Sequence, residues 1–111
     1  MKLADNPRVG TLPDFGNFII DRETGEEYDK YLGMQELLPY AKALSAKAFK
    51  INRHGEEPDI DFYRIMKMAV EAGYNGYVGI EYEGDDWPEE KGIRQTIALL
   101  ERVHRQLIQE A

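Results

Sequence analysis

Cysteine is absent from this 111-residue sequence, histidine occurs only twice, and basic residues are outnumbered by acidic ones, 14 to 21. The lack of cysteine excludes a disulfide framework, a thiolate nucleophile and a cysteine-ligated zinc site. A net charge of −7 argues against nucleic-acid binding, because phosphate contacts need clustered lysine and arginine. No apolar run reaches the roughly 18–20 residues that cross a bilayer, and no apolar leader follows Met1. We therefore expect a cytoplasmic protein that binds neither membranes nor nucleic acid.

The composition is typical of a folded domain, with 42% hydrophobic and 32% charged residues, and the length suits a single domain over residues 1–111. Three apolar segments, at residues 8–12, 43–49 and 77–82, have the character of strands, and each precedes a helical pattern. They begin about 34 residues apart, which is the size of a βα unit. Helical-pair repeats have a similar length, but Gly79 and its β-branched neighbours favour a strand.

The helices have recognisable ends. Asp59 or Asp61 is the expected N-cap of a helix over residues 62–72, and Gly73 is its expected left-handed C-cap. A helix at residues 34–38 must be short or bent because Pro39 follows it. The expected buried stripe of the last helix consists of Ile93, Ile97, Leu100 and Leu107. Residues 16–31 are expected to form a long, charged connection.

Strands that alternate with helices predict an α/β fold with parallel strands and right-handed crossovers. Three such strands place all helices on one side and leave the other face bare, whereas parallel sheets are normally covered on both faces. A closed (β/α)8 barrel uses units of this length, about 250 residues in all. The sequence therefore predicts three consecutive βα units equivalent to the last part of such a barrel.

Polar side chains are expected to gather at the carboxyl ends of these strands, which is the catalytic end of an α/β barrel. Strand alternation puts Glu81 on the face that points away from the helices, with Asp14 and Lys47 at matching positions on the other two strands. Two carboxylates in one cleft need a cation, a shared proton or water. Mn²⁺ or Mg²⁺ suits oxygen ligands, and Lys47 is placed to face a phosphate or enediolate oxygen.

Simpler interpretations of the same residues stay open. Asp14 follows a proline and precedes Phe15-Gly16, so it is also suited to stabilising a turn. Lys47 and Glu81 are also suited to a plain structural ion pair. His54 lies in a polar loop, where a histidine is normally exposed. Three acidic residues after the third strand have the character of a solvated loop: Glu83, Asp85 and Asp86.

Three segments together resemble a known family: residues 12–17 (LPDFGN), residues 45–47 (SAK) and residues 72–84 (AGYNGYVGIEYEG). They are similar to the xylose isomerase-like TIM barrel superfamily, and in particular to the sugar phosphate isomerases and epimerases of AP endonuclease family 2. The resemblance covers nearly the whole chain and implies the C-terminal portion of the barrel.

The resemblance also implies roles for individual residues. Members hold one divalent metal ion with Glu, Asp, His and Glu from four successive strands. Asp14 and Glu81 match two of these metal ligands, and Glu81 also matches the acid/base. Asn17 and Lys47 match substrate-binding positions, and Lys47 is the second catalytic candidate. Ser45 stands where the family has its histidine ligand.

The expected function is therefore that of the C-terminal part of a sugar or sugar phosphate isomerase or epimerase, which uses metal-assisted proton transfer next to a carbonyl and is incomplete or inactive as this chain alone. The alternative is a non-catalytic α/β module whose open sheet face binds another copy or a protein partner. A DNA repair nuclease is the weakest hypothesis, since that chemistry needs more histidine ligands and a basic cleft.

Overall fold

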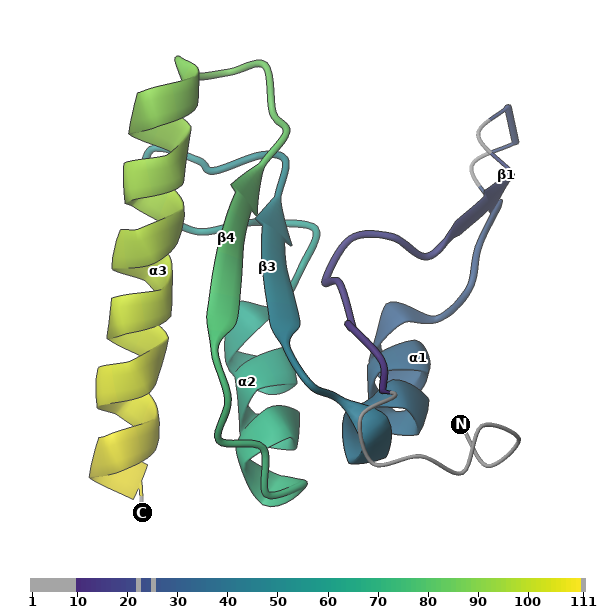
Figure 1. Cartoon of the computed structure of the whole chain (residues 1–111). Helices are drawn as coiled ribbons and strands as arrows, with labels where there is room; N and C mark the ends of the chain where they lie inside the picture. Colours follow the sequence, from purple (N-terminus) through teal and green to yellow (C-terminus); the bar gives the residue numbers. More distant parts are fainter. Residues whose placement is uncertain (1–9, 22, 25, 111) are drawn as a thin grey trace.

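A computed structural model describes residues 10–21, 23–24 and 26–110 (Figure 1). The chain forms a small parallel sheet with helices packed on one side. In chain order the elements are β1 (Ile19–Asp21), β2 (Glu26–Glu27), α1 (Lys30–Leu37), a 3₁₀ turn (Leu38–Tyr40), β3 (Leu44–Ala48), α2 (Phe62–Glu71), β4 (Val78–Tyr82) and α3 (Glu89–Glu110). In the described part of the chain, no helix is both long enough and apolar enough to cross a membrane.

The parallel pairing predicted from the sequence is present between β3 and β4, whose register runs from Leu44 opposite Val78 to Ala48 opposite Tyr82. The segment before β1 lies along the other edge of β3. It forms two isolated parallel bridges there, Thr11 with Ala41 and Asp14 with Ser45. The α/β class with parallel strands is therefore confirmed for two βα units.

The first of the three predicted strands is not confirmed. Its residues 8 and 9 lie outside the described residues, and residues 10–14 make bridges without forming a continuous strand. Pro13 has no amide hydrogen to donate, which limits regular pairing at this point. Its carbonyl instead accepts a hydrogen bond from the Ser45 amide at 2.9 Å. The described residues thus contain two complete βα units and an edge segment.

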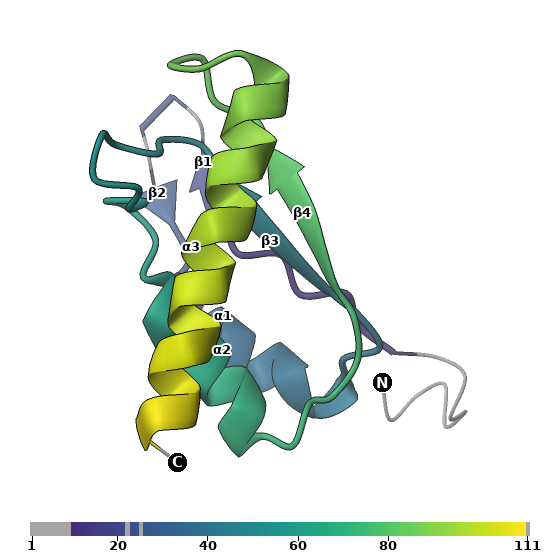
Figure 2. The same ribbon diagram turned by 90° about the vertical axis from the view of Figure 1, so that its left-hand side faces the viewer.

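Helices α2 and α3 lie on the same side of the sheet, as the two views show (Figures 1 and 2). The alternation of β4 explains this arrangement, because Val78, Ile80 and Tyr82 belong to the core cluster on that side. On β3, Ala46 and Ala48 are fully buried. No helix in the described part of the chain covers the opposite face, which carries the alternate residues of both strands.

The ends of α2 agree with the sequence-based expectation and decide between its two candidate caps. The Asp61 carboxylate accepts a hydrogen bond from the Arg64 amide at 3.0 Å, so Asp61 is the N-cap. Asp59 instead forms an exposed ion pair with Lys50 at 3.5 Å. Gly73 has a φ of +82° and ends the helix, as expected of a left-handed cap.

The expected buried stripe of α3 is wrong in its first half. Ile93 and Ile97 are 37% and 39% exposed, whereas Leu100 and Leu107 pack against the core as expected. The buried residues of α3 are Gly92, Thr96, Leu99 and Val103. The physical reason is the close approach of α3 to β4, because a Cβ atom at position 92 would overlap the Tyr82 ring. Small residues therefore form the contact that larger ones were expected to make.

The segment over residues 16–31 contains more structure than a simple connection. Strands β1 and β2 pair antiparallel, with Ile19 opposite Glu27. The following helix α1 begins at an Asp29 N-cap, whose carboxylate accepts from the Tyr31 and Leu32 amides. It ends in the 3₁₀ turn that contains Pro39, as the position of that proline predicted.

Candidate functional site

The candidate site is built around a buried lysine on β3. Residues Ser45 and Lys47 alternate with Ala46 and Ala48, so their side chains lie on the sheet face without helices. Lys47 is only 5% exposed. Its stem packs near Phe49, with 5.9 Å between the ammonium nitrogen and the ring centroid. The charged end lies at the carboxyl ends of the strands.

Four oxygen-bearing side chains converge on the Lys47 ammonium group. It donates a hydrogen bond to the Asn17 amide oxygen at 2.6 Å. Its distances to carboxylate oxygens are 3.6 Å for Asp14, 3.6 Å for Glu81 and 3.4 Å for Glu83. We call Lys47 and these four partners, together with Ser45, the Lys47 cluster. It brings together every residue that the sequence predicted for the site: Asp14, Asn17, Lys47 and Glu81.

Asp14 and Ser45 each fix part of the cluster. One carboxylate oxygen of Asp14 accepts a hydrogen bond from the Gly16 amide at 2.8 Å, while the other faces Lys47. The turn interpretation of Asp14 is therefore confirmed, whereas its role as a ligand stays a prediction. The Ser45 hydroxyl donates to Glu81 at 3.1 Å and restrains that carboxylate. Ser45, which the resemblance implies stands at a histidine position, thus supports Glu81.

The cluster shifts the acidities of its two central groups. Burial acts to lower the pKa of Lys47, but the charges of Asp14, Glu81 and Glu83 outweigh it and raise that pKa above its usual value. The pKa of Glu81 is lowered by its hydrogen-bonding contact with Glu83, by the Ser45 hydroxyl and by the charge of Lys47. Near neutral pH the site therefore contains an ammonium group and an ionised Glu81.

Glu83 is the site residue that the sequence analysis missed, since it was assigned to a solvated acidic loop. Its side chain is half exposed, yet one carboxylate oxygen lies 3.4 Å from the Lys47 nitrogen. The available signal was its alternation with Glu81, which places both on one face. His54, by contrast, is exposed in the loop between β3 and α2 and lies outside the cluster.

The residues present do not by themselves make up a divalent-metal centre. Asp14 and Glu81 are the predicted ligands, but both face the Lys47 ammonium. Among the described residues, no group of three or more His, Cys, Asp and Glu side chains is arranged to hold a metal ion. The neutral Ser45 hydroxyl is a weak substitute for an imidazole ligand. The expected Mn²⁺ or Mg²⁺ site therefore stays a prediction.

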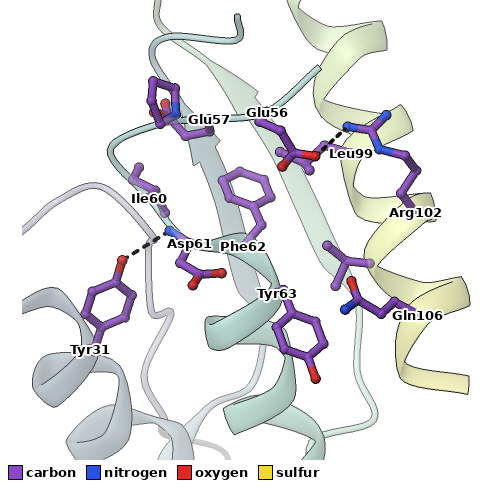
Figure 3. Close-up of a pocket in the computed structure, with 12 residues that line it drawn as sticks. Tyr31, Glu56, Glu57, Ile60, Asp61, Phe62, Tyr63, Leu99, Arg102 and Gln106 are labelled. Atoms are coloured by element: carbon purple, nitrogen blue, oxygen red, sulfur yellow. Dashed lines mark hydrogen bonds and ion pairs between the residues drawn. The ribbon is translucent and has the colours of Figure 1, made fainter. Parts of the chain in front are cut away.

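One hollow reaches the cluster, and another lies on the helical side of the sheet. A hollow of about 590 Å³ is lined by Gly16, Phe49 and Glu83 together with the acidic loop 84–86. Its size suits a small organic ligand. The other hollow, of about 440 Å³, lies between α2, α3 and the loop that precedes α2 (Figure 3). Internal contacts frame it: Arg102 pairs with Glu56 at 3.6 Å, and the Asp61 amide donates to the Tyr31 hydroxyl at 3.1 Å.

Three proteins that are similar to this chain in sequence are alpha subunits of deglycosidases. A 3'-dehydrocarminate deglycosidase alpha subunit from a Microbacterium species is 28% identical over 67% of this chain and 21% of its own length. A C-glycoside deglycosidase alpha subunit from Arthrobacter globiformis is 33% identical over 68% of the chain and 22% of its own length. The equivalent subunit from Microbacterium trichothecenolyticum is 41% identical over 46% of the chain and 14% of its own length.

The chain thus spans less than a quarter of the length of these relatives. The family model described as "Xylose isomerase-like TIM barrel" matches residues 1–103, which is most of the sequence. The two parallel βα units and the polar cluster at their carboxyl ends fit this match. The chain belongs to the xylose isomerase-like TIM barrel family.

Proposed function

We propose that this chain supplies part of the substrate site of a sugar-processing enzyme, with Glu81 as the acid/base that moves a proton next to a sugar carbonyl. The observation that carries the proposal is the Lys47 cluster, in which a buried ammonium group and three carboxylates meet at the carboxyl ends of parallel strands. This is the end at which enzymes of this barrel architecture bind their substrates.

Glu81 suits the removal of the proton, and Lys47 suits the stabilisation of the negative charge that results. Glu81 is ionised near neutral pH, so it can accept a proton from carbon. Negative charge then develops on the carbonyl oxygen, and the Lys47 ammonium stabilises charge of this sign. Asn17 holds Lys47 through its amide oxygen and so orients it. These side chains account for the removal of the proton from carbon, and no step is assigned to a metal ion.

The names of the relatives suggest which sugars to test. A dehydro sugar carries a carbonyl in place of a hydroxyl group, and a carbonyl makes the neighbouring C–H bond more acidic. The substrate class we propose is therefore a sugar, sugar phosphate or glycoside whose sugar ring or chain bears a carbonyl. The relatives are subunits by name, and we propose that this chain likewise acts together with further polypeptide that completes the barrel.

Binding of a ketose to the isolated chain tests this proposal directly. We expect D-fructose or D-fructose 6-phosphate to shift the amide NMR signals of residues 14–17, 45–49 and 79–84. Lys47→Met and Glu81→Gln should abolish these shifts, whereas Lys67→Met, which changes an exposed lysine of α2, should retain them. Shifts confined to other parts of the chain, or unchanged in Lys47→Met and Glu81→Gln, would contradict the proposal.

The second candidate is a non-catalytic module that binds another copy of itself through the helix-free face of the sheet. Tyr77 and Leu12 favour it, because they precede the cluster residues on this side and are 91% and 63% exposed. Exposed apolar side chains next to an open parallel sheet are typical of an association surface. The native mass in solution tests this second candidate, because self-association gives more than the mass of one chain.

A further inference from the structure

We propose that Lys47 is the resident cation of this site: its ammonium group occupies the position between Asp14 and Glu81, so this chain does not bind Mn²⁺ or Mg²⁺ there. The inference rests on the proposed function for the location of the site. It concerns a separate property, namely which positive charge neutralises the two carboxylates.

The geometry of the ammonium group is the first argument. It lies at the same distance, 3.6 Å, from Asp14 and from Glu81. Both side chains that would have to share a metal ion therefore have an oxygen within ion-pair distance of this ammonium group. An ammonium group has three donor hydrogens and no acceptor. Here it donates one hydrogen bond, to the Asn17 amide oxygen at 2.6 Å, and its charge faces three carboxylates at 3.4–3.6 Å.

The restricted freedom of the lysine is the second argument. The Lys47 side chain is 6% exposed, so it does not leave the cluster without a change in the surrounding packing. Gly16 and Phe49 enclose the stem: a Cβ atom at Gly16 would lie 3.2 Å from the Lys47 Cδ and 2.6 Å from the Phe49 ring. A divalent ion at Asp14 and Glu81 would therefore share the site with a confined ammonium group, and the two like charges would repel.

The substitution at Ser45 is the third argument. A neutral imidazole nitrogen is a strong ligand for first-row divalent ions, and a serine hydroxyl is not. In this chain the hydroxyl donates its hydrogen to Glu81 at 3.1 Å. Ser45 thus holds Glu81 in the position where that carboxylate pairs with Lys47. The serine at position 45 and the buried Lys47 ammonium group both disfavour a divalent ion at Asp14 and Glu81.

Paramagnetic broadening by Mn²⁺ in amide NMR spectra of the chain tests the inference. We expect wild-type protein to show no broadening centred on residues 14, 45–47 and 79–83. Lys47→Met removes the ammonium group, and Ser45→His with Lys47→Met also adds an imidazole ligand. Both variants should gain broadening centred on these residues, with apparent affinity for Mn²⁺ at least about tenfold tighter than that of the wild type. Lys67→Met should behave like the wild type.

Two results would overturn the inference. One is broadening centred on the cluster in the wild type that disappears in Asp14→Asn, because Lys47 would then not exclude the ion. The other is a folded Lys47→Met variant that gains no affinity. The wild-type titration decides the matter even where a variant does not fold. The ketose titration is a separate measurement, so a failure of the proposed function and a failure of this inference are distinguishable.

Discussion

The charge of Glu81 makes the stability of the folded protein depend on pH in the acid range. Because Ser45, Glu83 and Lys47 lower its pKa in the folded protein, ionised Glu81 contributes stability above its unfolded pKa near 4.5. That contribution is lost as the pH falls through the lower folded pKa. The contribution is at most about 1 kcal/mol, since nearly half the side chain is exposed and water screens the charge.

We therefore predict that Glu81→Gln is less stable than wild type at pH 6–7 and that the difference disappears as the pH falls below 4.5. Urea unfolding curves at several pH values measure this difference. Glu101→Gln, which changes an exposed carboxylate on α3, is the matched control. A Glu81→Gln difference that stays constant down to pH 3 would show that the carboxylate charge is not its cause.

Tyr82 carries a buried polar atom without a partner. Its side chain is 7% exposed, and its hydroxyl has no hydrogen-bond partner among the described residues. Leaving a buried hydroxyl unsatisfied costs about 1–3 kcal/mol. We predict that Tyr82→Phe is as stable as the wild type or more stable, whereas Tyr82→Leu is less stable because it removes the packed ring. A clear loss of stability in Tyr82→Phe would reveal a hydrogen bond to this hydroxyl.

At the scale of single residues, the sequence indicated Asp14, Lys47 and Glu81 but not Glu83, which follows β4 and was assigned to a solvated loop. Alternation predicts that Asp14, Lys47 and Glu81 lie on one face, because successive side chains of a strand point to opposite sides. Glu57 is a buried loop residue whose role alternation does not predict. It is 5% exposed, and its carboxylate accepts hydrogen bonds from the Phe49, Lys50 and Asp59 amides, all at 2.9 Å. A loop has no such period, so nothing in the sequence indicated this role.

Helix α2 offers the first prediction at the scale of elements. Asp61 accepts the hydrogen bond from the Arg64 amide, whereas Asp59 only forms an exposed ion pair. We predict that Asp61→Ala lowers the free energy of unfolding by about 1 kcal/mol through loss of the cap. Asp59→Ala should change it by less than about 0.5 kcal/mol. Urea unfolding of both variants measures this, and equal effects would contradict the assignment of the cap.

A second prediction concerns helix α3, whose close contact with β4 depends on Gly92. Alanine favours a helix over glycine by about 1 kcal/mol. A methyl group at position 92 would nevertheless overlap the buried Tyr82 ring, and overpacking costs about 1–3 kcal/mol. We predict that Gly92→Ala destabilises the protein in thermal unfolding. In a Tyr82→Leu background the same change should be neutral or stabilising, and destabilisation in both backgrounds would rule out the ring as the cause.

The elements themselves were only partly predictable from the sequence. The strands at residues 43–49 and 77–82 were found because they are short, largely apolar segments in which polar residues fall at alternate positions. The pair of β1 and β2 was not, since two short strands in a charged segment bury too little apolar surface to leave a pattern. The stripe of α3 failed at Ile93 and Ile97 because apolar size was used to define the buried face. The closest contact in fact requires the smallest side chain, that of Gly92.

At the scale of the whole molecule, the described sheet has fewer strands than a closed barrel. A (β/α)8 barrel closes eight strands on one another, whereas the described residues contribute β3, β4 and the edge segment before β1. Helices cover one face (Figure 1), and alternation along the strands places the Lys47 cluster on the other. In a barrel this second face is the interior, so under the proposed function it carries part of the substrate site and further polypeptide surrounds it.

This requirement leads to a prediction about the native mass in solution. If the isolated chain covers its helix-free face with a second copy, light scattering on a sizing column will give more than the mass of one chain, increasing with concentration. Leu12→Ser and Tyr77→Ser should reduce the mass, because both remove exposed apolar surface from this side. Val70→Ser, which changes an exposed residue of α2 on the helical side, should leave it unchanged. The mass of one chain at every concentration would contradict self-association. In that case the substrate site needs a different polypeptide to complete it, and catalysis should be sought only when that polypeptide is present.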